Sequence, residues 1–393
     1  MDLNFHYYAV KTLAIRAGFT EEQGQVIANY SQFVDDFTSF VPIILDDVPD
    51  FAQHLATKWG NKWLFTPVTT GFESWFDMAR LILEVNQRAI TVPFHFIPPH
   101  AKLNEKKEGD ERTEWRVVAA HMNVDSQIRD LMLEAQRAFI DNPDDKVNLI
   151  RIGLLLHIFA DTYAHQNFSG FWGWENYCSL EHVYDNSTKE DITDSYSPKW
   201  YFLFPGIGHT EANHAPDDSN VTIDMKMKLT QSGGYDFPYS RSNTSEFCAL
   251  AREVIDYFSA CLKKEPISGD EWIELCPLLG KGFLTSLKQT VALDKHWKSI
   301  FPDIEYCYDK ESVMDSLLEK RYNAANLPDE YKDLISELAE NGAEVEPAVY
   351  KAKSDEYFRY NVLAENVRTF VNGTTIESEQ AEKLRKALNA LGK

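Results

Sequence analysis

The sequence predicts a mainly α-helical protein in which helices are joined by long loops. Most apolar residues fall in stretches long enough for helices, whereas runs that alternate apolar and polar residues, as strands do, are few. Helix start and stop signals punctuate these stretches, and the chain has neither an internal repeat nor a low-complexity tract. Hydrophobic residues make up 44% and charged residues 25% of the 393 residues, so a sizeable folded core is expected.

The first hundred residues begin with two predicted helices. Residues 5–17 form the first, which Gly18 ends, because glycine readily takes the backbone conformation found just past a helix. Thr20 and Gln23 have the spacing of a capping box, which predicts a second helix that runs to about Asp36. The remaining elements expected here are a helix at 73–90 among mixed loops and a proline-bounded, non-helical segment at 92–100.

The rest of the chain alternates helices with polar stretches. The expected order is a charged, solvated loop at 103–114, helices at 114–141 and 144–168, a loop-rich stretch at 169–245, helices at 245–263 and 270–293, and a polar helical segment at 311–393. The helix at 144–168 is the most apolar of them. We therefore divide the chain into a helical domain at 1–300, which the residues below mark as metal-binding and catalytic, and a helical C-terminal extension at 301–393 packed on it.

Charge and targeting signals limit the possible functions. Lys and Arg number 39 against 61 Asp and Glu, a formal charge of −22, so the surface repels polyanions and disfavours long nucleic acids and anionic membranes. The start of the sequence lacks the features of a secretory signal, and the sequence contains no run of about 18 apolar residues, the length of a transmembrane helix.

The five cysteines are scattered and form no CxxC pair, which indicates reduced thiols. These features predict a cytoplasmic protein, and export as an effector by a signal-independent route stays open.

The strongest functional signal lies in the stretch RIGLLLHIFADTYAHQNFSG, residues 151–170. His157, Asp161 and His165 follow one another at four-residue spacing, so on a helix their side chains share one stripe. Burial of such groups without partners would cost several kcal/mol, which a metal ion, a hydrogen-bond network or water must offset. Imidazole and carboxylate together favour Zn²⁺ and related divalent ions, and Asp161 is placed to bridge two of them.

The first two helices carry further candidate ligands. His6 lies on the first helix, where a purely structural histidine is the alternative. Asp35 and Asp36 end the second helix, at the negative end of its dipole, so they need a cation nearby. Either a basic side chain or a metal ion meets that need.

Two later segments also contain histidines. In the glycine- and proline-rich loop at 204–218, His209 is the favoured ligand, whereas His214 and Asp217 are equally well explained as surface groups. His95 is flanked by apolar residues, which suits a buried ligand or a residue that supports one. No GxSxG, Walker, GxGxxG or HExxH motif occurs, so other mechanisms have less support.

These residues, in this order on an α-helical chain, resemble the zinc-dependent phospholipase C and single-strand-specific nuclease superfamily. The resemblance implies a multi-helix bundle of the zinc-dependent phospholipase C type that holds a cluster of metal ions and cleaves phosphate esters. More closely, the segments FHYYAVKTLA, YSQFVDD, LLLHIFADTYAHQNFSG and GIGHTEA are similar to an uncharacterised bacterial family known only as a domain of unknown function. That similarity covers roughly residues 5–240.

Carried over by position, the resemblance implies a ligand set. His157 and Asp161 match the superfamily's His-x-x-x-Asp ligands and His165 its next histidine, while His6 and either Asp35 or Asp36 match the early ligands. The chain also departs from the pattern. It begins with Met1 where the superfamily uses a mature N-terminal Trp, its histidine spacing is shorter, and the later His-x-x-x-Glu pair is replaced at best by His214 and Asp218. Two or three ions are therefore expected.

The predicted function is a metal-dependent, zinc-preferring hydrolase of phosphate esters. Its small substrate would be a phospholipid head group or a nucleotide, and its oligomeric state is left open. The expected metal ligands are His6, Asp35, His157, Asp161, His165 and His209, with Asp161 also bridging and Asp36 orienting or deprotonating a water. The alternatives are a helical protein with a structural metal site and a metal-dependent amidase or peptidase.

Overall fold

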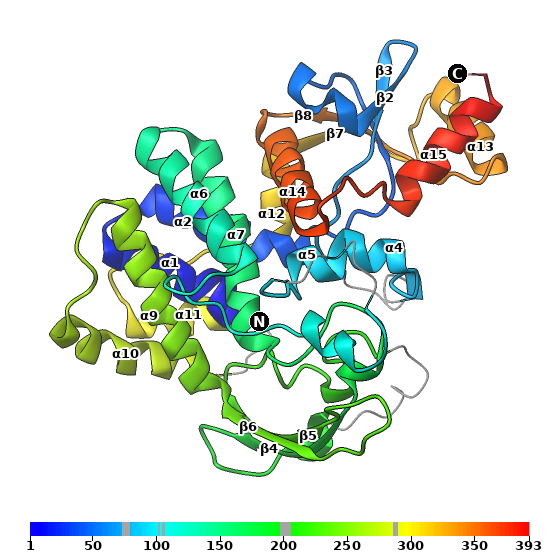
Figure 1. Ribbon diagram of the computed structural model, residues 1–393. Helices are drawn as coiled ribbons and strands as arrows, with labels where there is room; N and C mark the ends of the chain where they lie inside the picture. Colours follow the sequence, from blue (N-terminus) through cyan, green and yellow to red (C-terminus); the bar gives the residue numbers. More distant parts are fainter. Residues whose placement is uncertain (73–78, 101–102, 104–106, 197–205, 286–289, 393) are drawn as a thin grey trace. The chain divides into compact units, whose positions relative to one another are not determined.

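The computed structural model describes all residues except 73–78, 101–102, 104–106, 197–205, 286–289 and 393. It divides into two compact units, each formed by two separate segments of the chain (Figure 1). The first unit comprises Met1–Val34 and Thr91–Tyr308, and the second comprises Asp35–Ile90 and Asp309–Lys393. Helices account for 53% and strands for 13% of the residues, and the described strands form two sheets. The prediction of a mainly α-helical bundle is therefore wrong, because the fold is mixed α/β.

The first unit contains the longest helices. Its helices are the π-helix η1 (Asn4–Ala9), α1 (Val10–Ala17), α2 (Glu21–Asp36, whose last two residues are counted with the second unit), α5 (Val92–Phe94), η4 (Gly109–Trp115), α6 (Gln127–Asp141), α7 (Lys146–Ala164), η5 (Trp174–Asn176), α8 (Thr193–Tyr196), η7 (Thr210–Ala212), α9 (Asn243–Cys261), α10 (Gly269–Phe283) and α11 (Thr290–Ile300). Its strands are β4 (Cys178–Asp185), β5 (Val221–Met227) and β6 (Phe237–Ser242).

Capping side chains explain where several of these helices begin and end. Thr20 Oγ1 accepts from the Gln23 N–H at 3.2 Å, and Gln23 Oε1 accepts from the Thr20 N–H at 3.1 Å, which confirms the predicted capping box before α2. Gly18, with a φ of 109°, ends α1 as predicted. The Asp145 side chain accepts from the Val147 N–H at the start of α7.

The helix α7 is the core helix of the first unit. By length and composition it could cross a membrane, with a mean hydropathy of 1.2, but 89% of that window is buried inside the protein. Buried core helices pass the same test, so this is weak evidence for a transmembrane segment. The helix predicted at 114–141 is shorter than expected, because α6 begins only at Gln127, after Ser126 caps it.

A three-stranded antiparallel sheet occupies the stretch that was predicted to be rich in loops. Its order is β4-β5-β6. The β5 sequence VTIDMKM alternates buried and half-buried side chains along its whole length, and its buried residues pack in one apolar cluster with Val183 and Phe168. This alternation is a strand signal, so the prediction of loops across 169–245 is wrong for these strands.

The second unit is built around a five-stranded sheet. Its helices are η2 (Asp50–Leu55), α4 (Glu84–Asn86), η3 (Gln87–Thr91, whose last residue is counted with the first unit), α12 (Lys310–Leu317), α13 (Asp329–Glu340), α14 (Glu356–Asn372) and α15 (Glu379–Ala390). Its strands are β1 (Ile43–Leu45), β2 (Ala56–Trp59), β3 (Lys62–Phe65), β7 (Leu318–Tyr322) and β8 (Val349–Ala352), in the order β2-β3-β1-β8-β7. Part of the helix predicted at 73–90 lies outside the described residues.

Pairing between distant segments explains why the second unit is discontinuous in sequence. The strand β1 pairs antiparallel with β3 and parallel with β8, so that Ile44 lies opposite Val349. Apolar residues from both segments, Ile44 and Leu64 with Leu334 and Leu384 among them, share one buried cluster. The C-terminal segment therefore joins residues 35–90 in one unit, which differs from the predicted division at residue 300.

Candidate metal centre

The helix α7 brings two of the predicted ligands into the interior of the first unit. Gly153 lets α7 approach α2 closely: a Cβ atom on Gly153 would lie 2.5 Å from the Ile27 carbonyl oxygen and 3.1 Å from the Ser31 nitrogen. One turn later, the His157 Nδ1 donates to the Ser31 carbonyl oxygen at 2.9 Å. His157 and Asp161 are both buried, so the groups they face decide whether they are satisfied.

His95, His157 and Asp161 form what we call the inner group. The His95 Nδ1 lies 3.1 Å from Asp161 Oδ2, and the His157 Nε2 lies 3.2 Å from the same oxygen. The two ring nitrogens are 3.3 Å apart. Around a tetrahedral Zn²⁺ with bonds of about 2.0–2.1 Å, ligand atoms are separated by about 3.3 Å. The spacing of these three atoms therefore fits a metal ion of that size.

His165, His209 and Asp217 form a second set, the outer group. The His165 Nε2 lies 2.9 Å from Asp217 Oδ1, and the His209 Nε2 lies 3.1 Å from Asp217 Oδ2. These side chains are 4%, 15% and 20% exposed, whereas those of the inner group are at most 7% exposed. The outer group is therefore the part of the centre that solvent reaches.

His165 does not lie on the helical stripe that the sequence predicted. The helix α7 ends at Ala164, and His165 is its C-cap residue, with φ −97° and ψ 18°. The His165 Nδ1 donates to the His95 carbonyl oxygen at 2.6 Å, so that its Nε2 faces Asp217. His157 and Asp161 lie on one face of α7 as expected, whereas His165 follows the end of the helix and belongs to the outer group.

Asp161 connects the two groups through its second oxygen. Asp161 Oδ1 lies 3.2 Å from the His6 Nε2 and accepts from the α-amino group of Met1 at 2.7 Å. The same amino group lies 3.0 Å from Asp217 Oδ1. His6 belongs to the π-helix η1, a rare conformation that is frequent at functional sites. A positive charge thus sits between two carboxylates, at the place where the centre needs a cation.

Backbone carbonyl groups orient three of the histidines. The Nδ1 atoms of His157, His165 and His209 donate to the carbonyl oxygens of Ser31, His95 and Asn213, at 2.9, 2.6 and 2.6 Å. In the neutral ring each Nε2 then carries a lone pair, and each of these lone pairs faces a carboxylate oxygen. Two acceptors repel one another unless a cation lies between them or the ring is protonated. Carbonyl-bonded Nδ1 atoms are also the usual means of orienting metal-binding histidines.

Burial disfavours the protonated histidines that could otherwise satisfy this arrangement. It lowers the pKa of His6 to about 4, with a further decrease from His157 and the α-amino group, and it lowers the pKa of His165. Burial alone would raise the pKa of Asp161 and Asp217, yet the α-amino group and the histidines hold both values well below the usual range. Neutral imidazole and charged carboxylate are the forms that bind metal ions.

Side chains from β6 and α9 hold the loop that carries Asp217. Arg241 donates to the last two carbonyl oxygens of α7, each at 2.6 Å, and to the Pro216 carbonyl oxygen at 2.8 Å. Asn243 donates to the Asp218 carbonyl oxygen at 2.7 Å. These bonds are made to backbone atoms, so the fold itself fixes where the outer group lies relative to α7.

A glycine turn brings His209 into the outer group. Gly208 has a φ of +55°, and a Cβ atom there would lie 2.2 Å from the Phe96 ring. That ring stacks on His165, with ring centres 4.3 Å apart. A larger residue at position 208 would therefore displace both histidines of the outer group.

Comparison with known proteins shows the family of this chain. Residues 1–375 match a family described as "Family of unknown function (DUF6765)". The chain belongs to the DUF6765 family. The matched residues include every member of the inner and outer groups. No curated protein and no solved structure matches the chain, so the resemblance of this DUF6765 member to the zinc-dependent phospholipase C and nuclease superfamily stays a prediction.

Most of the predicted ligands lie together in this DUF6765 chain. The predicted residues found at the centre are His6, His157, Asp161, His165 and His209. These side chains could hold a metal ion, and their identity as zinc ligands stays a prediction. Asp35 and Asp36 are the last two residues of α2 and are counted with the second unit, so their predicted roles as ligand and as base also stay predictions.

Three members of the centre were absent from the predicted ligand set. His95 had a usable signal in its apolar flanks, and Asp217 had one in its proline-bounded loop. The α-amino group of Met1 had a signal only in the resemblance, since the superfamily uses its mature N-terminal residue at the metal cluster; the tertiary structure brings the start of η1 against the end of α7.

Blocking the α-amino group of Met1 should destabilise the metal-free protein. With that charge acetylated, the carboxylates of Asp161 and Asp217 would be buried without their nearest cation, which costs about 3 kcal/mol of unfolding free energy. Urea denaturation of the acetylated and the free-amine chain, both treated with a chelator, measures this difference. Added zinc should reduce this difference in unfolding free energy, since the ions supply the missing positive charge. Equal stabilities without metal would show that the amino group does not compensate these carboxylates.

Proposed function

We propose that the first unit is a divalent-metal-dependent hydrolase of phosphate esters that holds two ions, preferably zinc. The spacing of the inner group supports this most, because three ligand atoms lie 3.1–3.3 Å from one another around one point. Asp161 presents its other oxygen to His6 and the α-amino group, on the side of the outer group. Two ions held in such a centre would polarise a phosphoryl oxygen and lower the pKa of bound water.

The two groups would have different tasks. Structural zinc sites are closed by protein ligands, whereas catalytic sites keep one position open for water or substrate. The inner group is nearly fully buried, and His6 stacks on His157 with ring centres 3.9 Å apart. The outer group is partly exposed, with His209 and Asp217 at 15% and 20%, so water or substrate can reach it. We therefore assign substrate binding to the outer group, where Asp217 would also accept hydrogen bonds from an approaching water.

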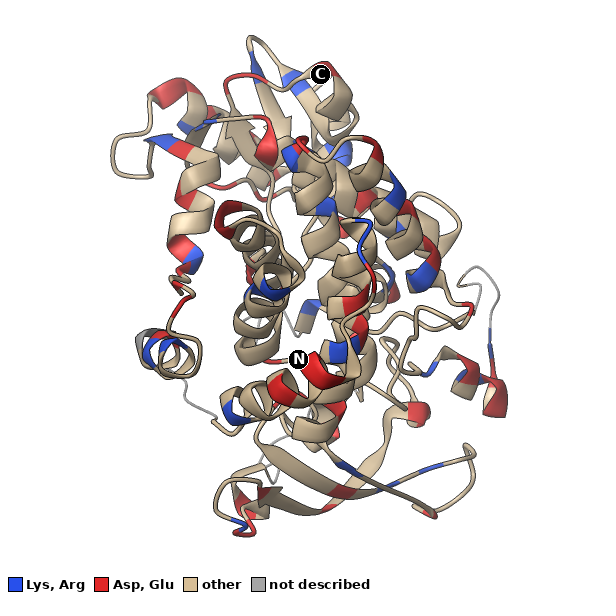
Figure 2. Ribbon diagram, turned by 90° about the vertical axis from the view of Figure 1, so that its left-hand side faces the viewer, with Lys and Arg blue, Asp and Glu red and all other residues tan. Residues whose placement is uncertain are grey.

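The substrate that suits this chain is small. The protein has 61 Asp and Glu against 39 Lys and Arg, a formal charge of −22, and Figure 2 shows the acidic residues distributed along the helices and loops. Such a surface repels a long nucleic acid. A phospholipid head group or a mononucleotide would present a single phosphate to the centre. Hydrolysis of an amide by the same centre is the alternative that a substrate panel must include.

A second candidate function is a structural metal site without turnover. The nearly complete burial of the inner group favours it, because structural ions contribute directly to folding. In that case the outer group would be a hydrogen-bonded surface cluster. The two candidates differ in what the loss of an outer ligand does.

Elemental analysis and turnover assays on three variants test the proposal. The wild-type chain should carry two zinc ions and hydrolyse bis(p-nitrophenyl) phosphate, but not a peptide p-nitroanilide. His209→Ala should keep its fold and the inner ion and lose at least about 100-fold in turnover. His157→Ala should lose the inner ion and much of its stability. His182→Ala, at an exposed histidine of β4 bonded to Asp191, is the matched control and should change neither quantity.

The possible results separate the candidates. One ion per chain, retained by His209→Ala, with no turnover of any substrate in the wild type, would favour the structural site. Turnover of the anilide alone would favour an amidase. A fully folded wild-type chain that binds no divalent ion would contradict both metal functions.

A further inference from the structure

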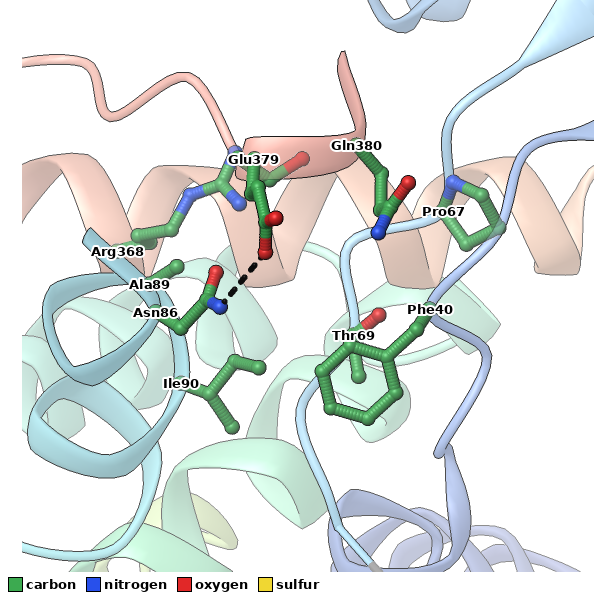
Figure 3. A pocket seen from close by; sticks show the side chains of 10 residues that line it. Phe40, Pro67, Thr69, Asn86, Ala89, Ile90, Arg368, Glu379 and Gln380 are labelled. Carbon is green, nitrogen blue, oxygen red and sulfur yellow. Dashed lines mark hydrogen bonds between the residues drawn. The ribbon is translucent and has the colours of Figure 1, made fainter. Parts of the chain in front are cut away.

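The second unit contains a pocket of its own (Figure 3). The helices α14 and α15 and the residues around η3 contribute to it, and its empty space is about 360 Å³, part of it open to solvent. Phe40, Pro67, Ala89 and Ile90 form its apolar lining. A mixture of an apolar wall with a few polar groups is typical of small-molecule sites.

Arg368 is a buried charge in the lining of this pocket. Its residue is 6% exposed, and burial lowers its pKa, yet a guanidinium group stays charged in proteins. Within the described part of the chain, its Nε has no acceptor and its side chain forms no ion pair. Glu365, the acidic group whose charge acts on it, is bonded to His54 instead. A buried guanidinium without an ion pair is costly, and a ligand anion bound to it would offset that cost.

Gln380 lines the same pocket and has a buried acceptor atom that lacks a donor among the described residues. The residue is 6% exposed, and this acceptor is its Oε1. It lies in the first turn of α15, just after Ser378, whose side chain accepts from the Ala381 N–H at 3.3 Å. The positive end of this helix dipole favours an anion nearby, and the free Oε1 favours a donor on the same ligand.

Glu379 limits the charge that the ligand can carry. Figure 3 shows it between Arg368 and Gln380, and its carboxylate accepts from Asn86 at 3.2 Å and lies 2.6 Å from Lys383. A dianion such as hydrogen phosphate would be repelled by this carboxylate. A monoanion would be repelled about half as strongly and so meets Arg368 at a smaller penalty.

We infer that this pocket binds a small organic carboxylate that carries a hydroxyl or amino group. The planar fork of Arg368 matches a carboxylate, the Gln380 Oε1 accepts from the hydroxyl or amino group, and the apolar wall contacts a short carbon chain. The site lies within the second unit and uses none of the residues of the metal centre, so it does not depend on the proposed hydrolase function.

Isothermal titration calorimetry of the full chain tests the inference with four probes. L-lactate and L-alanine should bind. Propionate, which lacks the donor of lactate, should bind about tenfold more weakly, because the Gln380 Oε1 stays unpaired. Inorganic phosphate, much of which is dianionic at pH 8, should bind at least about tenfold more weakly than lactate at that pH. If no probe bound up to about 10 mM, or if phosphate bound more tightly than lactate, the inference would be wrong.

Two variants connect the binding to the two side chains. Arg368→Met should bind lactate at least about tenfold more weakly, while its ligand-free melting temperature should stay the same or rise, because an uncompensated buried charge has been removed. Gln380→Met should bind lactate only as well as the wild type binds propionate. Arg385→Met, on the exposed side of α15 where Arg385 pairs with Glu377, is the control and should bind as the wild type does.

The variants also expose a purely structural role. If Arg368 only stabilised the unit, Arg368→Met would melt at a lower temperature than the wild type. If Gln380 made no contact with the ligand, Gln380→Met would bind lactate like the wild type. That pair of results would overturn the inference, as would unchanged lactate binding in Arg368→Met.

Discussion

Asp161→Asn should release both metal ions and abolish turnover while leaving α7 in place. Asparagine keeps the size of the side chain, but only one of its two terminal atoms can bind a metal. In the wild type, Asp161 Oδ2 lies within 3.2 Å of ring nitrogens of His95 and His157. Its Oδ1 lies within 3.2 Å of the His6 Nε2 and of the α-amino group of Met1. We therefore expect turnover to fall by at least about 1,000-fold, the effect of losing a bridging ligand rather than a peripheral one.

Stability should respond to the same substitution in a metal-dependent way. Zinc at 1,000 times its dissociation constant should raise the unfolding free energy of the wild type by about 4 kcal/mol for each bound ion, and that of Asp161→Asn by less than about 1 kcal/mol in total. Urea denaturation with zinc and with a chelator measures both gains. Asp224→Asn makes the same chemical change at a half-buried position in β5, and it should behave as the wild type. A variant of Asp161 that keeps two ions and full turnover would show that this residue is not a ligand.

Local signals explain the parts of the centre that the sequence predicted. The spacing of His157 and Asp161, the capping pair Thr20 and Gln23, and the stop at Gly18 all act within a few residues of chain, so they can be recognised without the fold. The apolar run around His157 indicated burial, and burial made a partner for its ring necessary.

Contacts between distant segments explain what the sequence did not show. The pairing of β1 with β8 creates the sheet of the second unit, and neither three- nor four-residue strand has a strong period of its own. His95 enters the inner group because the end of α5 packs against α7, and its carbonyl oxygen also turns His165 toward Asp217. The strand β5 is the exception, because its alternation of apolar and polar residues could be recognised in the sequence.

Gly153→Ala should weaken both the fold and the metal centre. In most helix interiors this substitution stabilises a protein by about 0.5–1 kcal/mol. At position 153 the new Cβ atom would lie 2.5 Å from the Ile27 carbonyl oxygen and 2.9 Å from the Tyr30 Cβ, so α7 and α2 must separate. We expect the unfolding free energy to fall by about 1–3 kcal/mol, as in other overpacked interiors. Separation would also lengthen the bond from His157 to the Ser31 carbonyl oxygen, so zinc affinity should fall with stability.

Gly280→Ala supplies the matched control for this prediction. Gly280 lies inside α10, and a Cβ atom there would meet only the Cys248 Sγ at 3.9 Å, an ordinary contact. The two glycine-to-alanine changes should therefore shift the urea midpoint in opposite directions, down at 153 and up at 280, and only the first should change zinc affinity. Equal stabilisation by both would mean that α7 and α2 do not approach closely at Gly153. The positioning of His157 by the Ser31 carbonyl, on which the orientation of its Nε2 toward Asp161 depends, would then have no structural basis.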